Sequence, residues 1–177
     1  LKIENDFEKT ESLSDYREIY DKLFLDEIPD SDKPDGDYLE GFGIRVWWEY
    51  VHQGDVSEAA INDDLTKLII FMNDPKCPSL VKVIITITFF EYVHPFYDGN
   101  GRMGSFLLSS CIARKTDLLT GISLSEVINQ NCKEYEEVFL QVSHPRIEEK
   151  SDIYWQIVEI IENGQKNMLF KLDKLNS

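Results

Sequence analysis

The apolar segment from Leu80 to Val93 ends directly at a polar stretch of nine residues, His94 to Arg102, with the sequence HPFYDGNGR. Only Lys82 and Glu91 interrupt the apolar segment with charges. At about three to four helical turns, it is longer than a typical strand. It is also too short to span a bilayer. We therefore expect a buried helix that opens into a polar loop.

Helical spacing of apolar residues and end signals predict five further helices. Ser57 is a suitable N-cap, and Asp74 with Pro75 is a stop signal, so the helix between them is well bounded. A stretch rich in Asp, Pro and Gly, 26–37, is expected to be a loop. The expected helices run from Leu13 to Phe24, from Ser57 to about Asn73, from near Asn100 or Gly101 to about Thr116, from Leu124 to about Ser143 with a break near Asn131, and from Asp152 to about Leu172.

One segment has the composition of a strand. Gly43 to His52 is rich in Val, Trp and Tyr and is closed by Gln53, Gly54 and Asp55, which predicts a short hairpin or an extended flap. The expected fold class is therefore all-α, a helical bundle with a small β-hairpin flap beside the polar loop. We expect a single domain over residues 1–177, with an N-terminal helical segment and loop (1–37), a core (38–143) and a C-terminal helix (144–177).

The charge balance argues against a nucleic-acid partner. The chain has 33 acidic and 18 basic residues, so its formal net charge of −15 repels polyphosphate backbones. Its three cysteines form no CxxC pair, which favours neither a disulfide framework nor a zinc site. The chain starts at Leu1 without the pattern of a secretory signal, so we expect a cytoplasmic location, no membrane association, and a piece of a longer protein.

The stretch from His94 to Arg102 contains groups that suit phosphate chemistry. The N-terminus of the following helix would present backbone N–H groups and the positive end of its dipole to a phosphate lying over Gly99 to Gly101. Arg102 in the first turn opposes that dipole, which is unfavourable unless an anion is bound there. Asp98 would repel the phosphate unless a cation lay between them, and one carboxylate with phosphate oxygens is a usual Mg²⁺ site.

His94 is the side chain of this stretch whose protonation changes near neutral pH, so it can accept a proton from an incoming hydroxyl. We expect Phe96 to anchor the loop in the core. Each residue alone has an ordinary structural explanation, because a histidine at a helix end, an Asp-Gly turn and a surface arginine are all common. Their order and spacing together favour the functional interpretation.

The nine residues resemble the signature of the Fic family, usually written HxFx(D/E)GNGRxxR. The match holds at every defined position up to Arg102, and Ser105 stands where the second arginine would be. The resemblance extends to Arg45–Gly54, Ile61–Met72 and Leu124–Tyr135. It implies a Fic-like fold and a protein adenylyltransferase, an enzyme that transfers AMP from ATP to a Ser, Thr or Tyr hydroxyl of a protein and releases pyrophosphate.

The resemblance also implies a role for each matching residue. His94 would be the general base, Asp98 would hold Mg²⁺, Arg102 would hold the β-phosphate, and Asn100 with the backbone of Gly99 and Gly101 would bind phosphate. A flap formed by Trp47, Trp48, Glu49, Tyr50 and Val51 would align the target segment by strand-like backbone pairing.

Ile3-Glu4-Asn5 matches the end of the inhibitory helix of many Fic proteins, whose pattern is Ser/Thr-x-x-x-Glu-Gly/Asn. In the family this glutamate pairs with the second arginine and blocks the productive pose of the ATP γ-phosphate. Ser105 removes that arginine, and because a charge-assisted hydrogen bond is worth about 1.5–3 kcal/mol, we expect γ-phosphate binding to be weakened roughly tenfold to a hundredfold. The other interpretation of Glu4 is an exposed residue near a frayed terminus, and both stay open.

Two alternatives to AMP transfer remain. One is a related reaction: the transfer of another nucleotide, the transfer of a phosphoryl group as in the Doc-like branch, or the removal of AMP. The other is a nucleotide-responsive interaction module whose acidic surface and aromatic flap bind a partner without chemistry. The expected ligands are ATP with Mg²⁺, and the expected partner is a protein substrate, while self-modification and a homo-oligomer stay open.

Overall fold

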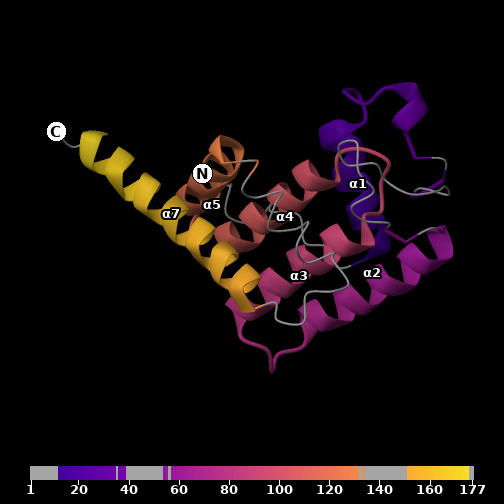
Figure 1. The fold of residues 1–177 in the computed structure, drawn as a ribbon, viewed down its shortest axis with the longest axis horizontal. Coiled ribbons are helices and arrows are strands. Elements are labelled where there is room, and N and C mark those ends of the chain that lie inside the picture. The colour runs from indigo at the N-terminus through magenta and orange to yellow at the C-terminus, as the bar shows by residue number, and fades with distance from the viewer. Residues whose placement is uncertain are drawn as a thin grey trace. The chain divides into compact units, whose positions relative to one another are not determined.

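The computed structural model describes residues 12–34, 36–38, 54–55, 57–131, 133 and 151–175. No strand occurs among them, so the all-α expectation is confirmed for this part of the chain. The expected hairpin flap, 43–52, lies outside the described residues. The elements are α1 (Leu13–Phe24), a short 3-10 turn η1 (Asp30–Asp32), α2 (Glu58–Asn73), α3 (Ser79–Val93), α4 (Asn100–Lys115), α5 (Leu118–Gln130) and α7 (Ser151–Leu175) (Figure 1).

The end signals in the sequence place α2 as predicted. The hydroxyl of Ser57 accepts a hydrogen bond from the backbone N–H of Ala60, at 3.3 Å, as an N-cap residue does. The helix ends at Asn73, before Asp74 and Pro75. The expected bounds of α1 are also confirmed, and those of α3, α4 and α7 hold to within three residues. No helix in the described part of the chain has both the length and the apolar composition that a bilayer crossing requires.

The predicted start of α5 at Leu124 is wrong, because the helix begins at Leu118. Asp117 is its N-cap: the carboxylate accepts hydrogen bonds from the backbone N–H of Thr120, at 2.9 Å, and from its hydroxyl, at 2.7 Å. These two bonds lower the pKa of Asp117. The end of α5 at Gln130 agrees with the predicted break near Asn131, and residues 134–143 of the expected continuation lie outside the described part.

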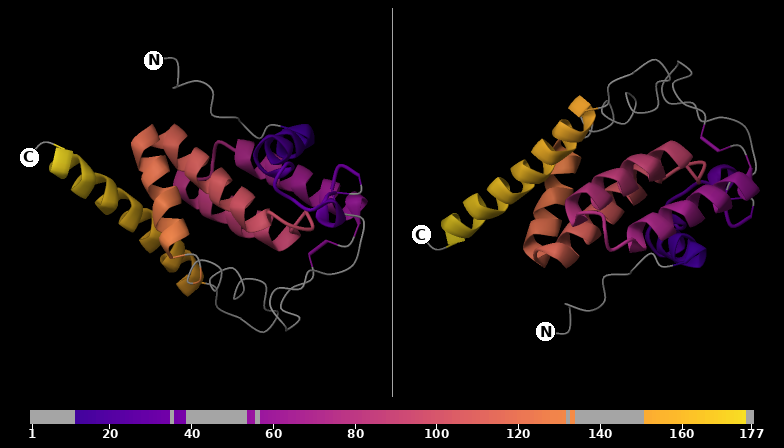
Figure 2. Two further views of the ribbon diagram at one scale, coloured as in Figure 1. Left: turned by 90° about the horizontal axis from the view of Figure 1, so that it is seen from above. Right: turned by 90° about the horizontal axis from the view of Figure 1, so that it is seen from below.

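The chain packs as two compact units. The first unit ends at Gly104 and the second begins at Ser105, so the boundary between them falls inside α4. In the first unit, α2 and α3 lie side by side and α1 contacts α2 (Figures 1 and 2). The ring of Tyr16 on α1 stacks on Phe90 of α3, with the ring centres 5.8 Å apart. The buried apolar side chains of this unit include Tyr16, Ile19, Tyr20, Ile61, Leu65, Leu68, Val83, Ile87, Phe90, Val93 and Phe96. The expectation of one domain over residues 1–177 stays a prediction.

The second unit is built around the packing of α5 against α7 (Figure 2). Two glycines allow close helix contacts in this unit. A Cβ on Gly164 would lie 3.0 Å from the Cα of Leu124, and a Cβ on Gly121 would lie 2.7 Å from the Cβ of Ala113. The hydroxyl of Ser125 donates to that of Ser109 at 2.7 Å. Small residues thus set the spacing of these helices.

Candidate active site

His94 ends α3 in a left-handed backbone conformation. Its φ is 52° and its ψ is 61°, and its N–H donates to the Phe90 carbonyl oxygen at 2.9 Å. Among the described residues, it alone combines a positive φ with a side chain. Helices commonly end in this conformation, but with glycine or asparagine at the left-handed position. For other residues it costs about 1–3 kcal/mol, and strain of this kind is often retained at functional positions.

The half-buried imidazole of His94 lies near the end of its own helix. Its Nδ1 atom is 3.3 Å from the carbonyl oxygen of Glu91. If Nδ1 carries the proton, the ring donates to this oxygen and Nε2 remains a proton acceptor. The contact therefore favours the tautomer that a general base requires.

Gly54 and Asp55 pack against the end of α3, immediately before His94. The Asp55 N–H donates to the Val93 carbonyl oxygen at 3.0 Å. A Cβ on Gly54 would lie 2.6 Å from that oxygen and 2.8 Å from the Cβ of His94. Only glycine fits there without displacing the histidine. The sequence marked Gly54 only as the end of the expected flap, because no local signal reveals a contact across about 40 residues of chain.

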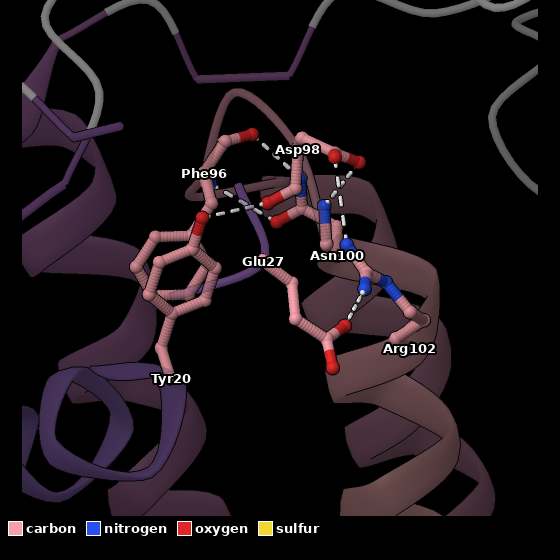
Figure 3. Close-up of polar contacts among 7 residues, drawn as sticks. Tyr20, Glu27, Phe96, Asp98, Asn100 and Arg102 are labelled. Atoms are coloured by element: carbon pink, nitrogen blue, oxygen red, sulfur yellow. Dashed lines mark hydrogen bonds and ion pairs between the residues drawn. The ribbon is translucent and has the colours of Figure 1, made fainter. Parts of the chain in front are cut away.

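Phe96 anchors the polar loop against α1. Its side chain is 0 % exposed and stacks on Tyr20 of α1, with ring centres 3.7 Å apart and an angle of 13° between the planes. The Tyr20 hydroxyl donates to the Asp98 carbonyl oxygen at 2.9 Å (Figure 3). Burial, with a contribution from the Asp98 carboxylate, raises the pKa of Tyr20 to about 12, so this hydroxyl keeps its proton at neutral pH. Tyr20 was not predicted as a site residue, because it lies far from the loop along the chain.

Asn100 closes the loop with both ends of its carboxamide. Its Oδ1 accepts from the Phe96 N–H at 3.0 Å, and its Nδ2 donates to the Phe96 carbonyl oxygen at 2.5 Å (Figure 3). The residue is 2 % exposed. The side chain therefore shapes the loop, and any phosphate contact at this position would use the backbone N–H. The expected phosphate-binding role of Asn100 stays a prediction.

The first turn of α4 follows Gly99, whose φ of 88° requires a residue without a side chain. The Gly99 N–H donates to Asp98 Oδ1 at 2.6 Å, and the Met103 N–H donates to the Gly99 carbonyl oxygen at 2.8 Å. A Cβ on Gly101 would meet no atom within 4 Å, so this side of the turn is open. A helix N-terminus with open space beside it suits an anion. We call this turn, together with Arg102, the anion site.

Arg102 contacts three groups of the first unit. Its Nη1 donates to Glu27 Oε2 at 3.0 Å and its Nη2 to Asp98 Oδ2 at 3.5 Å (Figure 3). Its guanidinium also lies over the ring of Phe24, 5.1 Å from the ring centre. Glu27 and Phe24 were not predicted from the sequence, because residues 75 apart in the chain carry no local pattern that pairs them.

The remaining predicted site residues are placed as follows. Ser105 is half-buried and begins the second unit. Glu4 and the flap residues Trp47 to Val51 lie outside the described residues, so their roles stay predictions. Within the described part, no cluster of three or more His, Cys, Asp or Glu side chains could hold a metal by itself. A cation at Asp98 would thus need ligands from a bound nucleotide.

Comparison with known proteins agrees with this geometry. Residues 11–112 match the Fic/DOC family, which is more than half of the 177 residues. No curated protein matches the chain. The fold is similar to the crystal structure of a Fic family protein from Desulfovibrio desulfuricans, with a TM-score of 0.69 and 18 % sequence identity. The similarity covers 96 % of this chain and 49 % of that one, so the chain spans about half the length of that protein. From the family match and the signature loop between α3 and α4, we conclude that the chain belongs to the Fic/DOC family.

Proposed function

We propose that this chain is a Fic-type nucleotidyltransferase that transfers AMP from ATP to a Ser, Thr or Tyr hydroxyl of a protein. The observation that carries this proposal is the loop from His94 to Arg102, which joins a candidate base at the end of α3 to an open helix N-terminus at α4. Family membership supports the same reaction class. The donor and the target are our inference.

The anion site would bind the phosphates of the nucleotide. Gly99 turns the chain at positive φ, and Gly101 leaves open space, so phosphate oxygens can approach the backbone N–H groups of the first turn. Arg102 adds a guanidinium that can donate two parallel hydrogen bonds to a phosphate. Asn100 and Phe96 keep the loop in shape through the two hydrogen bonds between them.

His94 would act on the attacking hydroxyl. Its Nε2 accepts the hydroxyl proton while the hydroxyl oxygen forms a bond to the α-phosphorus of ATP. The bond between the α-phosphorus and the oxygen that bridges to the β-phosphate breaks, and pyrophosphate leaves with that oxygen. The left-handed backbone at His94 and the Nδ1 contact with the Glu91 oxygen support this role by fixing the ring.

Asp98 is a suitable ligand for Mg²⁺ carried by the nucleotide. Its carboxylate is 52 % exposed and belongs to the loop directly before α4, and one carboxylate with phosphate oxygens is a common Mg²⁺ arrangement. When bound, the ion would supply positive charge against the phosphates. Asp98 already accepts from the Gly99 N–H, which orients the carboxylate for that contact.

The second candidate function is nucleotide binding without turnover. Ser105 replaces an arginine of the family signature, and Arg102 is engaged by Glu27 and Asp98. Both features weaken the contacts that would position the phosphates for transfer, which favours a bound nucleotide that is not turned over. The related reactions, transfer of another nucleotide, of a phosphoryl group, or removal of AMP, would use the same loop.

Intact-mass spectrometry of the protein and of candidate targets, after incubation with ATP and Mg²⁺, tests the proposal. The expected result is a mass increase of one AMP group on a hydroxyl. His94→Ala should reduce the rate about 10²- to 10⁴-fold, since this is the usual contribution of a general base, while ADP binding is retained. His94→Asn is the matched control, because asparagine tolerates the left-handed backbone but cannot accept the proton. Equal labelling by His94→Asn and the wild type would refute the role of His94, and nucleotide binding with no adduct would favour the second candidate.

A further inference from the structure

We propose that Glu27 is an internal competitor for Arg102, so that a nucleotide phosphate must displace this carboxylate before it can bind the guanidinium. The inference rests on the proposed function, because it describes how the same anion site is regulated. It concerns a residue outside the signature loop, on the segment that follows α1.

The ion pair occupies the donors that a phosphate would use. Glu27 Oε2 lies 3.0 Å from Nη1 of Arg102, and Asp98 Oδ2 lies 3.5 Å from Nη2, so carboxylates face both terminal nitrogens (Figure 3). An incoming diphosphate would meet these two negative charges before the guanidinium. Asp98 is the expected Mg²⁺ ligand, whereas Glu27 has no role in the proposed reaction. In the proposed reaction, the contact of Glu27 therefore competes with the phosphate for the guanidinium.

The backbone at Glu27 is held by its neighbours, which keeps the residue close to Arg102. Its backbone N–H donates to the Phe24 carbonyl oxygen at 3.0 Å, and Ile28, the next residue, is buried. The ring of Phe24 lies beneath the guanidinium of Arg102. Phe24, the last residue of α1, thus contacts the flat face of the guanidinium, and Glu27, on the segment that follows α1, contacts its edge.

The contact is weak enough to be displaced. The side chains of Arg102 and Glu27 are 46 % and 69 % exposed, and exposed ion pairs of this kind shift an equilibrium by up to about fivefold. Because a phosphate bound to Arg102 would lie near Glu27, neutralising this carboxylate would also lower charge repulsion. A competitor of this strength tunes nucleotide affinity and does not abolish binding.

This device differs from the inhibitory glutamate that the resemblance implies at Glu4. That glutamate would pair with the second arginine of the signature, which is Ser105 in this chain. Glu27 instead contacts the arginine that remains. A carboxylate from the segment that follows α1 would then provide the restraint on phosphate binding.

A role of Glu27 in orienting Arg102 would predict the opposite change in nucleotide affinity. If Glu27 served to orient Arg102 for the phosphate, its neutralisation would weaken nucleotide binding. Competition predicts that Glu27→Gln strengthens binding, because the amide keeps the size of the side chain and loses its charge. The sign of the change in affinity therefore decides between the two roles.

The experiment is isothermal titration of the full chain with ADP and Mg²⁺ at low ionic strength. We expect the Kd of Glu27→Gln to be about twofold to fivefold lower than that of the wild type, and the difference to shrink as salt screens the charges. Glu18→Gln is the matched control: Glu18 also lies on the α1 side of the first unit, is 67 % exposed, and pairs with Lys22 at 4.0 Å. Because Glu18 does not contact Arg102 in this structure, its neutralisation should change the Kd much less.

Three outcomes would overturn the inference. An unchanged or raised Kd in Glu27→Gln removes the competition while leaving the proposed function intact. An equal gain from Glu18→Gln shows that net charge, not the contact with Arg102, is responsible. If Glu27→Gln still strengthens binding in an Arg102→Gln background, the effect does not pass through the guanidinium. A failure of the wild type to bind ADP at all would instead refute the proposed function, and this inference with it.

Discussion

Asn100→Ala offers a direct test of how the signature loop is held together. The substitution leaves the Phe96 N–H and carbonyl oxygen without the partners that they have at 3.0 Å and 2.5 Å. Both residues are almost completely buried, and each buried polar group left without a partner costs about 1–3 kcal/mol. The better helix propensity of alanine at the start of α4 returns at most about 0.7 kcal/mol. Because water can enter the space left by the side chain, we take the lower half of that range, about 1–2 kcal/mol, for each of the two groups. After the gain in helix propensity is subtracted, we expect a loss of about 1–3 kcal/mol in the free energy of unfolding.

Thermal unfolding followed by circular dichroism measures this loss. For a chain of this size, each kcal/mol lost from the free energy of unfolding lowers the midpoint temperature by about 2–4 °C, so we expect the midpoint to fall by several degrees. Asn73→Ala is the matched control, since Asn73 is exposed and its side chain makes one bond, to the Ile69 carbonyl oxygen at 3.0 Å. That variant should stay within about 0.5 kcal/mol of the wild type.

Asn100→Asp separates the two hydrogen bonds. The aspartate keeps an acceptor for the Phe96 N–H but loses the donor to the Phe96 carbonyl oxygen and brings a carboxylate oxygen close to it. This variant should therefore also be less stable than the wild type. If Asn100→Ala lowers the midpoint no more than Asn73→Ala does, the carboxamide does not hold the loop and our account of its shape fails.

Three further predictions concern single positions. Folding raises the pKa of Tyr20 from its ordinary value of 10.0 to about 12. The protonated hydroxyl therefore contributes its full stability below about pH 10, and this contribution is lost as the pH rises through 12. The free energy of unfolding of Tyr20→Phe should depend less on pH between 10 and 12 than that of the wild type. Gly104→Ala should destabilise the protein by about 1–3 kcal/mol in urea unfolding, because a Cβ there would clash with the carboxylate of Glu91, which is buried and has little room to move, and would lie 3.2 Å from Cδ1 of Ile87. Gly101→Ala, with no atom within 4 Å, should be neutral or slightly stabilising. Equal effects of the two glycine variants would contradict this account. Ser105→Arg should raise ATP affinity in a titration, and an unchanged Kd would show that an arginine here does not contribute to γ-phosphate binding.

Much of the fold could be predicted because its signals are local. Ser57 and the Asp74-Pro75 pair marked both ends of α2, and the length of the apolar segment before His94 distinguished a helix from a strand. The predicted start at Leu124 left out Leu118 to Ser123, which contains Gly121 and the β-branched residues Thr120 and Ile122, all weaker helix formers than leucine or alanine. The signal that could have corrected it was the N-cap at Asp117 with Thr120 three residues later.

The candidate site could be predicted only as far as its residues are adjacent in the chain. The order of groups from His94 to Arg102 was sufficient to locate the loop and its helix. The contacts made by Tyr20 and Glu27 join positions more than 70 residues apart, and such contacts depend on packing rather than on spacing. The structural role of Asn100, which bonds both polar groups of the Phe96 backbone, could not be predicted either, because its carboxamide could equally have contacted a ligand.

The left-handed backbone at His94 limits how this position can be re-engineered. A library that randomises the codon for residue 94 would be filtered first by conformation and only then by chemistry. Valine, isoleucine and threonine would be strongly disfavoured there, since branching at Cβ conflicts with positive φ, and glycine, asparagine and aspartate would be recovered most readily as folded clones. Of these three residues, aspartate alone carries a proton acceptor, so a designer who seeks another base must use that shorter carboxylate or introduce a group from a neighbouring element.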